Sequence, residues 1–192
     1  ADAACMQRVG RILEDETSSR LAVILSACRG VTDALLGLVT ASEQRDARVA
    51  AQLDMIRQRH VTIAEALLTA GDASEYIARL DADCRDILSI VHAVHLTRSA
   101  SAAIRDVVAG FGEIWSTRLF ASYFSAVTRR PGAGDWVGAG RVIEVEWGAL
   151  GPAVRWGVSR ANAERVTPGD SAGTLIISGF IARNEQGLQT TL

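Results

Sequence analysis

Three short segments carry residue types that could bind a small polar substrate. The first, residues 26–33, reads Ser-Ala-Cys-Arg-Gly-Val-Thr-Asp and directly follows the apolar run 21–25. Hydroxyls at Ser26 and Thr32, a glycine that lets the backbone come close, and the free N–H groups at a helix start suit an anionic group. An ordinary strand-to-helix turn with Thr32 as the helix cap would give the same pattern.

The second segment, residues 110–117, reads Gly-Phe-Gly-Glu-Ile-Trp-Ser-Thr and surrounds a single carboxylate, Glu113. Helical spacing places small and polar residues on one side of this helix: Ala109, Gly110, Glu113, Ser116 and Thr117. Such a face could receive the amino group of a ligand at Glu113. Close helix packing through the glycines, with Glu113 in solvent, is the alternative.

The third segment starts where an apolar run ends, at Ser178-Gly179-Phe180-Ile181, and continues into the polar tail 183–189. Ligands of open parallel sheets bind at the carboxyl ends of the strands. A surface loop would also explain this pattern.

The elements that position these segments alternate between strand and helix. Residues 1–16 read as a helix with apolar positions at Met6, Val9, Ile12 and Leu13. Residues 21–25 form a continuous apolar run, which is typical of a strand buried on both faces of a parallel sheet. A turn at residue 30 and a helix over 31–41 complete a strand–turn–helix unit of the α/β type.

A helical section follows. Two apolar stripes, at Val49, Leu53, Ile56, His60, Ile63 and Leu67 and at Ile77, Leu80, Cys84, Ile87, Val91 and Val94, predict an antiparallel helical hairpin over about 43–95. Gly71-Asp72 is expected to separate its two helices. Ser101 is expected to cap a further long helix that runs to about residue 129.

Short strands are expected near the carboxyl end of the chain, at 135–137, 141–146 and 174–180, with a turn at 168–170. Residues 147–164 are ambiguous, since 161–166 could form a helical turn or more. The order of elements predicts an α/β fold that is interrupted by a helical section.

Composition excludes several classes of function. The 192 residues are 48% hydrophobic and carry a formal net charge of −2, so no nucleic-acid or anionic-membrane partner is expected. No apolar run is long enough to cross a bilayer.

Three widely spaced cysteines are expected to be reduced thiols of a cytosolic protein. His92 and His95 lack a third ligand nearby, so no metal site is expected. His60 is expected to be a hydrogen-bonded hairpin residue.

In this order, the three segments resemble the aspartate kinases. Residues 25–35 look like the second-strand motif of that family, and residues 112–119 look like its Gly-Glu helix motif. Residues 179–192 look like the segment that leads into its Gly-Arg-Gly motif. The hairpin is similar to that of aspartate kinases fused to a second enzyme, most often homoserine dehydrogenase.

This resemblance implies a three-layer αβα amino-acid kinase fold, with the chain as its N-terminal part. It implies transfer of the γ-phosphoryl group of MgATP to the β-carboxylate of aspartate, at the start of lysine, threonine and methionine synthesis. Carried over by motif, Ser26 and Thr32 would bind aspartate, Glu113 would hold its ammonium group, and Phe180 would line the pocket. The resemblance also implies small-molecule partners and a cytoplasmic homo-oligomer.

The sequence departs from the family pattern in ways that bear on activity. The Lys-Phe-Gly-Gly-Thr-Ser motif of the family would precede Ala1, and the arginine and aspartate of its later motif would follow Leu192. The sequence also starts at an alanine and not at a methionine. We therefore interpret the chain as a piece of a longer polypeptide, expect no catalytic residue in it, and expect it to be inactive alone. Gly138 stands where the family has an aspartate.

Two other functions fit the same sequence. One is another amino-acid kinase, acting for example on glutamate or uridylate. The other is a non-catalytic regulatory or dimerisation subunit built on the same fold. The aspartate assignment makes one spatial demand: the turn that contains Thr32 and the helix that contains Glu113 must meet at one cavity.

Overall fold

Strands and helices alternate at both ends of the chain, with consecutive helices between them. The computed structural model describes residues 2–129, 133–148, 151–167 and 173–192. The helices are α1 (Ala3–Glu14), α2 (Val31–Glu43), α3 (Val49–Leu67), α4 (Ala70–Thr97), α5 (Ala102–Val127), α6 (Trp156–Val166) and the 3-10 turn η1 (Ala139–Arg141). The strands are β1 (Arg20–Leu25), β2 (Ala133–Val137), β3 (Glu144–Gly148), β4 (Gly151–Val154), β5 (Gly173–Ser178), β6 (Ile181–Asn184) and β7 (Gln189–Thr191).

A parallel sheet of order β1-β5-β2 confirms the predicted α/β class. Its central strand β5 pairs with β1 from Arg20↔Gly173 to Leu25↔Ser178, so both strands end at the same edge. The prediction that 21–25 is buried on both faces is wrong. Exposure alternates along β1, and Ile24 is 68% exposed. Helices pack on one face of this sheet, whereas its other face is open in the described part of the chain.

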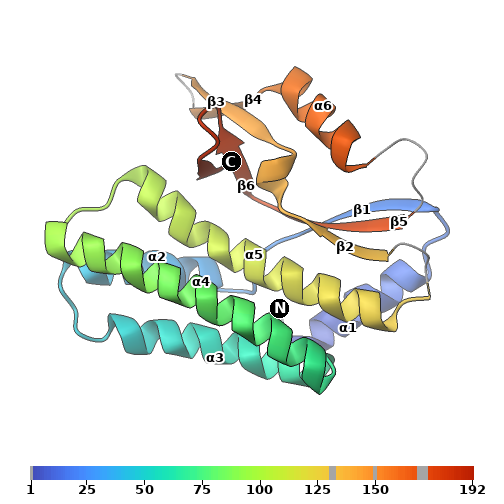
Figure 1. Ribbon diagram of the computed structural model, residues 1–192, viewed down its shortest axis with the longest axis horizontal. Coiled ribbons are helices and arrows are strands. Elements are labelled where there is room, and N and C mark those ends of the chain that lie inside the picture. Colours follow the sequence, from blue (N-terminus) through green and yellow to red (C-terminus); the bar gives the residue numbers. More distant parts are fainter. Residues whose placement is uncertain (1, 130–132, 149–150, 168–172) are drawn as a thin grey trace.

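The helices α2, α3, α4 and α5 pack together and form most of the core. Figure 1 shows α5 running between the parallel sheet and the pair α3 and α4. Because α5 contacts a helical layer on one side and strands on the other, it is apolar over most of its surface. Ser101 caps it, as predicted, by accepting a hydrogen bond of 3.3 Å from the N–H of Ile104.

The predicted hairpin is confirmed as α3 and α4, and both apolar stripes point into the core. The break between the two helices lies earlier than expected. Thr69 is the N-cap of α4, where its hydroxyl accepts from the N–H of Asp72, so Gly71-Asp72 is inside the first turn. In α1, the expected apolar position Ile12 is 62% exposed, whereas Met6 is buried.

A second sheet of order β4-β3-β6-β7 lies beyond the carboxyl edge of the parallel sheet, with α6 beside it (Figure 1). The strand predicted at 141–146 is only partly right, since η1 occupies 139–141 and β3 begins at Glu144. The ambiguous segment 147–164 contains the end of β3, β4 and most of α6. The turn predicted at 168–170 lies outside the described residues. None of the helices in the described ranges has the length and hydropathy needed to cross a membrane.

Candidate active site

Ser26 and Glu113 meet where β1 ends. The Ser26 hydroxyl donates a hydrogen bond of 3.0 Å to Oε1 of Glu113 in the middle of α5. The link is doubled by Ser116, whose hydroxyl donates to the carbonyl oxygen of Ser26 at 2.8 Å. The small polar face predicted for α5 is therefore turned toward the end of β1, and Glu113 is not in solvent.

The carboxylate of Glu113 is in an unusual environment. The residue is only 2% exposed, and its Oε2 has no hydrogen-bond partner among the described residues. Burial raises the pKa of this carboxyl above its usual range, while the N–H of Ala27 and the hydroxyl of Ser26 act in the opposite direction. An acceptor oxygen without a partner, inside the protein, suits a positively charged donor.

The two glycines of the Gly-Phe-Gly-Glu segment each allow another segment to approach α5. At Gly112, an added Cβ would lie 3.1 Å from Cγ1 of Val31 and 3.2 Å from Cβ of Ala27. At Gly110, an added Cβ would collide with the side chain of Gln189 on β7. Both glycines thus serve close packing, the alternative that the sequence left open, and that packing brings the turn after β1 against Glu113.

Thr32 lies in the first turn of α2, beside Val31, and its side chain is partly buried. The N-cap of α2 is Gly30, which has a φ of 76° and no side chain to cap the helix. Because Val31 packs on Gly112, the start of α2 faces the same part of α5 that carries Glu113. The positive end of the α2 dipole is therefore near this site.

Phe180 occupies the tight turn between β5 and β6. The N–H of Gly179 donates to the carbonyl oxygen of Leu25 at 2.7 Å, which fixes this turn beside the last residue of β1. Phe180 has a φ of 60° and is 43% exposed. A bulky residue in the left-handed region costs energy, and such strain is concentrated at functional sites. The residue is partly exposed and its backbone is in a costly conformation, so core packing does not explain it.

No local sequence pattern points to the carboxylate that binds strand β7. Asp106 of α5 accepts hydrogen bonds from the hydroxyls of Thr190 at 2.8 Å and Thr191 at 3.1 Å. Gln189 adds a bond to the carbonyl oxygen of Val107 at 3.2 Å. These partners are more than eighty residues apart, and no local pattern relates them. With Glu113 and Gly112, they make α5 the element to which the three segments are attached.

A second network ties α5 to the hairpin. Asp83 of α4 accepts from Nε1 of Trp115 at 3.0 Å and forms an ion pair with Arg118 at 2.9 Å. The guanidinium of Arg118 lies 4.8 Å from the ring centre of Trp136, whose Nε1 donates to the Thr117 hydroxyl at 2.9 Å. These contacts fix the orientation of α5 relative to α4 and β2.

The remaining polar residues have structural roles or no assigned role. His60 is fully buried, with Nδ1 2.9 Å from the carbonyl oxygen of Ile56, which confirms the predicted hydrogen-bonded role. His92 and His95 stack on each other. The described residues contain no group of three or more His, Cys, Asp or Glu side chains that could hold a metal. The three cysteines, all within the described ranges, form no disulfide.

Gly138 has a structural explanation. It lies at the N-cap of η1, and an added Cβ would approach Cη2 of Trp136 to 3.1 Å. An aspartate there would crowd the ring that stacks on Arg118. The glycine at this position therefore leaves room for the Trp136 ring.

Comparison with known proteins decides the relationship. Bifunctional aspartokinase/homoserine dehydrogenase 1 of Zea mays is 29% identical over 188 residues, which are 97% of this chain and 20% of that protein. The structure of Escherichia coli aspartokinase III in complex with aspartate and ADP superposes with a TM-score of 0.81 at 26% identity, over 100% of this chain and 41% of that one. Sequence and fold match part of an aspartokinase.

Further relatives agree with this match. Bifunctional aspartokinase/homoserine dehydrogenase 2 of Escherichia coli (strain K12) is 27% identical over 189 residues, 97% of this chain and 22% of that protein. No protein-family model matches the chain. The chain spans about a fifth of the length of the curated aspartokinase relatives it matches. The predicted amino-acid kinase fold, present in part, is confirmed, and the matched relatives are fusion proteins of the kind that the hairpin suggested.

Proposed function

We propose that the polypeptide containing this chain is an aspartate kinase, and that the chain provides part of its aspartate-binding site. The observation that carries this proposal is the buried Glu113 carboxylate, held by Ser26 at the carboxyl edge of the parallel sheet. Ligands of open α/β sheets bind at this edge. The chain resembles a protein whose structure was solved with aspartate and ADP, which supports the choice of substrate.

Glu113 would hold the ammonium group of aspartate. Its Oε2 is buried without a partner among the described residues, so an ammonium donor would restore the solvation that burial removes. A hydrogen bond between two charged groups contributes about 1.5–3 kcal/mol. The bound ammonium would also lower the pKa of Glu113, which burial raises in the free chain.

Thr32 and the start of α2 would orient a carboxylate of the same substrate. Ser26 would join them by turning its single hydroxyl hydrogen from Glu113 to the substrate when the ammonium group takes its place on Glu113. Two hydroxyls and the positive end of a helix dipole suit a negative group. Phe180 would form a wall beside the end of β1, where its half-exposed ring faces no packed core. An amino acid held at both its ammonium and its carboxylate ends has one orientation, which phosphoryl transfer requires.

The reaction itself would need groups in addition to these. An oxygen of the β-carboxylate attacks the γ-phosphorus of ATP, the new O–P bond forms as the bond to the β,γ-bridging oxygen breaks, and ADP leaves. Catalysis of this transfer comes mainly from positioning and charge stabilisation. ATP with bound Mg²⁺ supplies the phosphoryl group. Because the described residues offer no group of metal ligands, none of them is assigned to Mg²⁺.

A substrate assay tests the proposal on the longest natural polypeptide that contains this chain. β-Aspartyl phosphate, trapped with hydroxylamine, is expected with aspartate and ATP, and much less product with glutamate. Glu113→Ala is expected to raise the KM for aspartate at least tenfold, with the KM for ATP nearly unchanged. Preferential phosphorylation of glutamate would show that the protein is a different amino-acid kinase. Failure to phosphorylate any acceptor would favour a non-catalytic regulatory or dimerisation subunit. The 192-residue chain alone is expected to form none.

A further inference from the structure

Apart from the proposed aspartate site, a second pocket lies toward the carboxyl end of α5. It is formed between the first turns of α4, the carboxyl half of α5 and strand β2, and has a volume of about 240 Å³. Ser122, on its floor, is nine residues beyond Glu113, which is about 14 Å along the helix axis. The pocket is therefore separate from the proposed aspartate site, and the proposed function makes no use of it.

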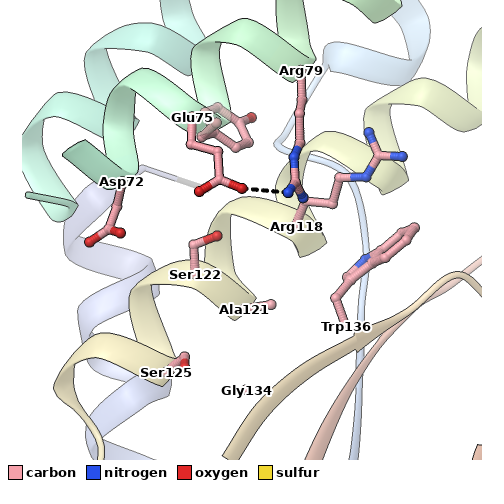
Figure 2. Close-up of a pocket in the computed structure, with 10 residues that line it drawn as sticks. Asp72, Glu75, Arg79, Arg118, Ala121, Ser122, Ser125, Gly134 and Trp136 are labelled. Carbon is pink, nitrogen blue, oxygen red and sulfur yellow. Dashed lines mark hydrogen bonds and ion pairs between the residues drawn. The ribbon is translucent and has the colours of Figure 1, made fainter. Parts of the chain in front are cut away.

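The charges around this pocket are divided by sign. Figure 2 shows the carboxylates of Asp72 and Glu75 toward the left and the guanidinium groups of Arg79 and Arg118 toward the right. Glu75 is paired with Arg79, and the hydroxyl of Ser122 lies below that pair in this view. An anion alone would meet the two carboxylates, and a cation alone would meet the two arginines. A small molecule with one charge of each sign would meet a complementary group at both ends.

The basic side contains one fixed group. Arg118 is held by its ion pair with Asp83 at 2.9 Å, and its guanidinium stacks on Trp136, which forms the wall of the pocket. A group already held in place loses little conformational entropy when a ligand arrives. Because the guanidinium has five N–H donors, one ion pair does not exhaust it.

A ligand could replace the ion pair between Glu75 and Arg79 at a small cost in free energy. The side chains of these residues are 66% and 64% exposed, and exposed ion pairs one helical turn apart contribute little to stability. A ligand that offers an ammonium to Glu75 and a carboxylate to Arg79 replaces one such pair by two.

We propose that this pocket binds a small zwitterion of the α-amino acid class. Its ammonium group contacts Glu75 and Asp72, its carboxylate contacts Arg79 and Arg118, and its side chain lies along Trp136. Nothing in the proposed kinase reaction requires this site, so the two assignments can fail independently.

Calorimetric titration of the 192-residue chain with the common L-amino acids tests this site, with propionate and ethylamine as one-charge controls. At least one amino acid is expected to bind at least tenfold more tightly than either control. Glu113→Gln separates the two sites, because it leaves this binding unchanged if the ligand is in the second pocket. Loss of all amino-acid binding in Glu113→Gln, or binding of propionate as tightly as of any amino acid, would overturn the proposal.

Charge variants locate the ligand. Glu75→Gln and Arg79→Gln are each expected to weaken binding by roughly tenfold or more, since each removes a charge-assisted hydrogen bond. Glu65→Gln, the same change at an exposed position of α3, is the matched control and should have no effect. Exchanging the pair, with Glu75→Arg and Arg79→Glu together, keeps the net charge and the ion pair but mixes the signs, so it should abolish binding without unfolding the chain. Unaltered binding in the exchanged variant would refute the site.

Discussion

Ser26 and Glu113 are 87 residues apart in the chain and are joined by a hydrogen bond of 3.0 Å. Ser26 directly follows the last residue of β1, and Glu113 lies in the middle of α5. The bond therefore connects the sheet to α5 at the point where the proposed substrate would lie. A buried carboxylate with one oxygen unpartnered among the described residues is costly to keep, which makes it a useful place to test function against stability.

Replacing Glu113 by glutamine should stabilise the chain while weakening aspartate binding. Burial raises the pKa of Glu113 above 4.5, so the folded chain binds this proton more tightly than the unfolded chain. The stability due to the protonated form is present below the unfolded pKa and is lost as pH rises through the folded pKa. Glutamine does not titrate, so its stabilising effect relative to glutamate should be smaller at about pH 4 than at about pH 8.

Urea unfolding of both proteins at the two pH values measures this gain. Glu65→Gln, at an exposed position, is the control and should show no such difference between them. A Glu113→Gln chain that is less stable than the original at neutral pH would mean that another group stabilises the charged carboxylate.

Local sequence patterns were sufficient for most of the helical part of the fold. The stripes of α3 and α4 and the cap at Ser101 follow from spacing and side-chain chemistry, and the structure confirms them. The polar face around Glu113 was also visible, because helical periodicity alone groups Gly110, Glu113 and Ser116. Residues that recur at 3.6-residue spacing lie on one face of a helix, so the sequence alone shows which of them are neighbours.

Long-range partners were not predictable from the same patterns. The apolar run of β1 suggested burial on two faces, yet Ile24 is exposed, since the covering of a strand depends on elements far away in sequence. Nothing in the local sequence relates Asp106 to Thr190 and Thr191, whose hydroxyls donate hydrogen bonds to it. The left-handed conformation of Phe180 was hidden as well, because glycine is the usual residue for that region.

Alanine at Gly112 should destabilise the chain and weaken aspartate binding. A Cβ there would be 3.1 Å from Val31 and 3.2 Å from Ala27, which must move away together with the turn that carries Ser26. Overpacking costs about 1–3 kcal/mol, and the higher helix propensity of alanine returns about 1 kcal/mol. The expected net loss is about 1 kcal/mol.

Gly37→Ala is the matched control. Gly37 is an exposed residue inside α2, and an added Cβ would meet nothing within 4 Å, so this variant should gain up to about 1 kcal/mol. Thermal unfolding of the two variants should give shifts of opposite sign. Shifts of the same sign would show that close packing at Gly112 is not the constraint.

The ion pair between Asp83 and Arg118 should contribute strongly to the free energy of unfolding, although it lies between two helices near the surface. Asp83→Ala removes the partner of both Arg118 and Nε1 of Trp115 and leaves a half-buried guanidinium without its counter-ion. We expect a loss of roughly 2–3 kcal/mol in the free energy of unfolding. Asp86→Ala, at an exposed position on the same helix, should change it by less than about 0.5 kcal/mol. Equal losses in the two variants would contradict this role.

Phe180 offers a test that separates backbone strain from the function of the ring. Its φ of 60° costs a non-glycine residue on the order of 1 kcal/mol. Phe180→Gly removes the ring and the strain, whereas Phe180→Ala removes the ring and keeps the strain. The glycine variant should therefore be about 1 kcal/mol more stable to urea than the alanine variant, the reverse of the usual order.

If the ring lines the aspartate site, both variants should lose aspartate affinity to the same extent in a calorimetric titration. An alanine variant as stable as the glycine variant would rule out strain, and unchanged affinity in both would remove Phe180 from the site.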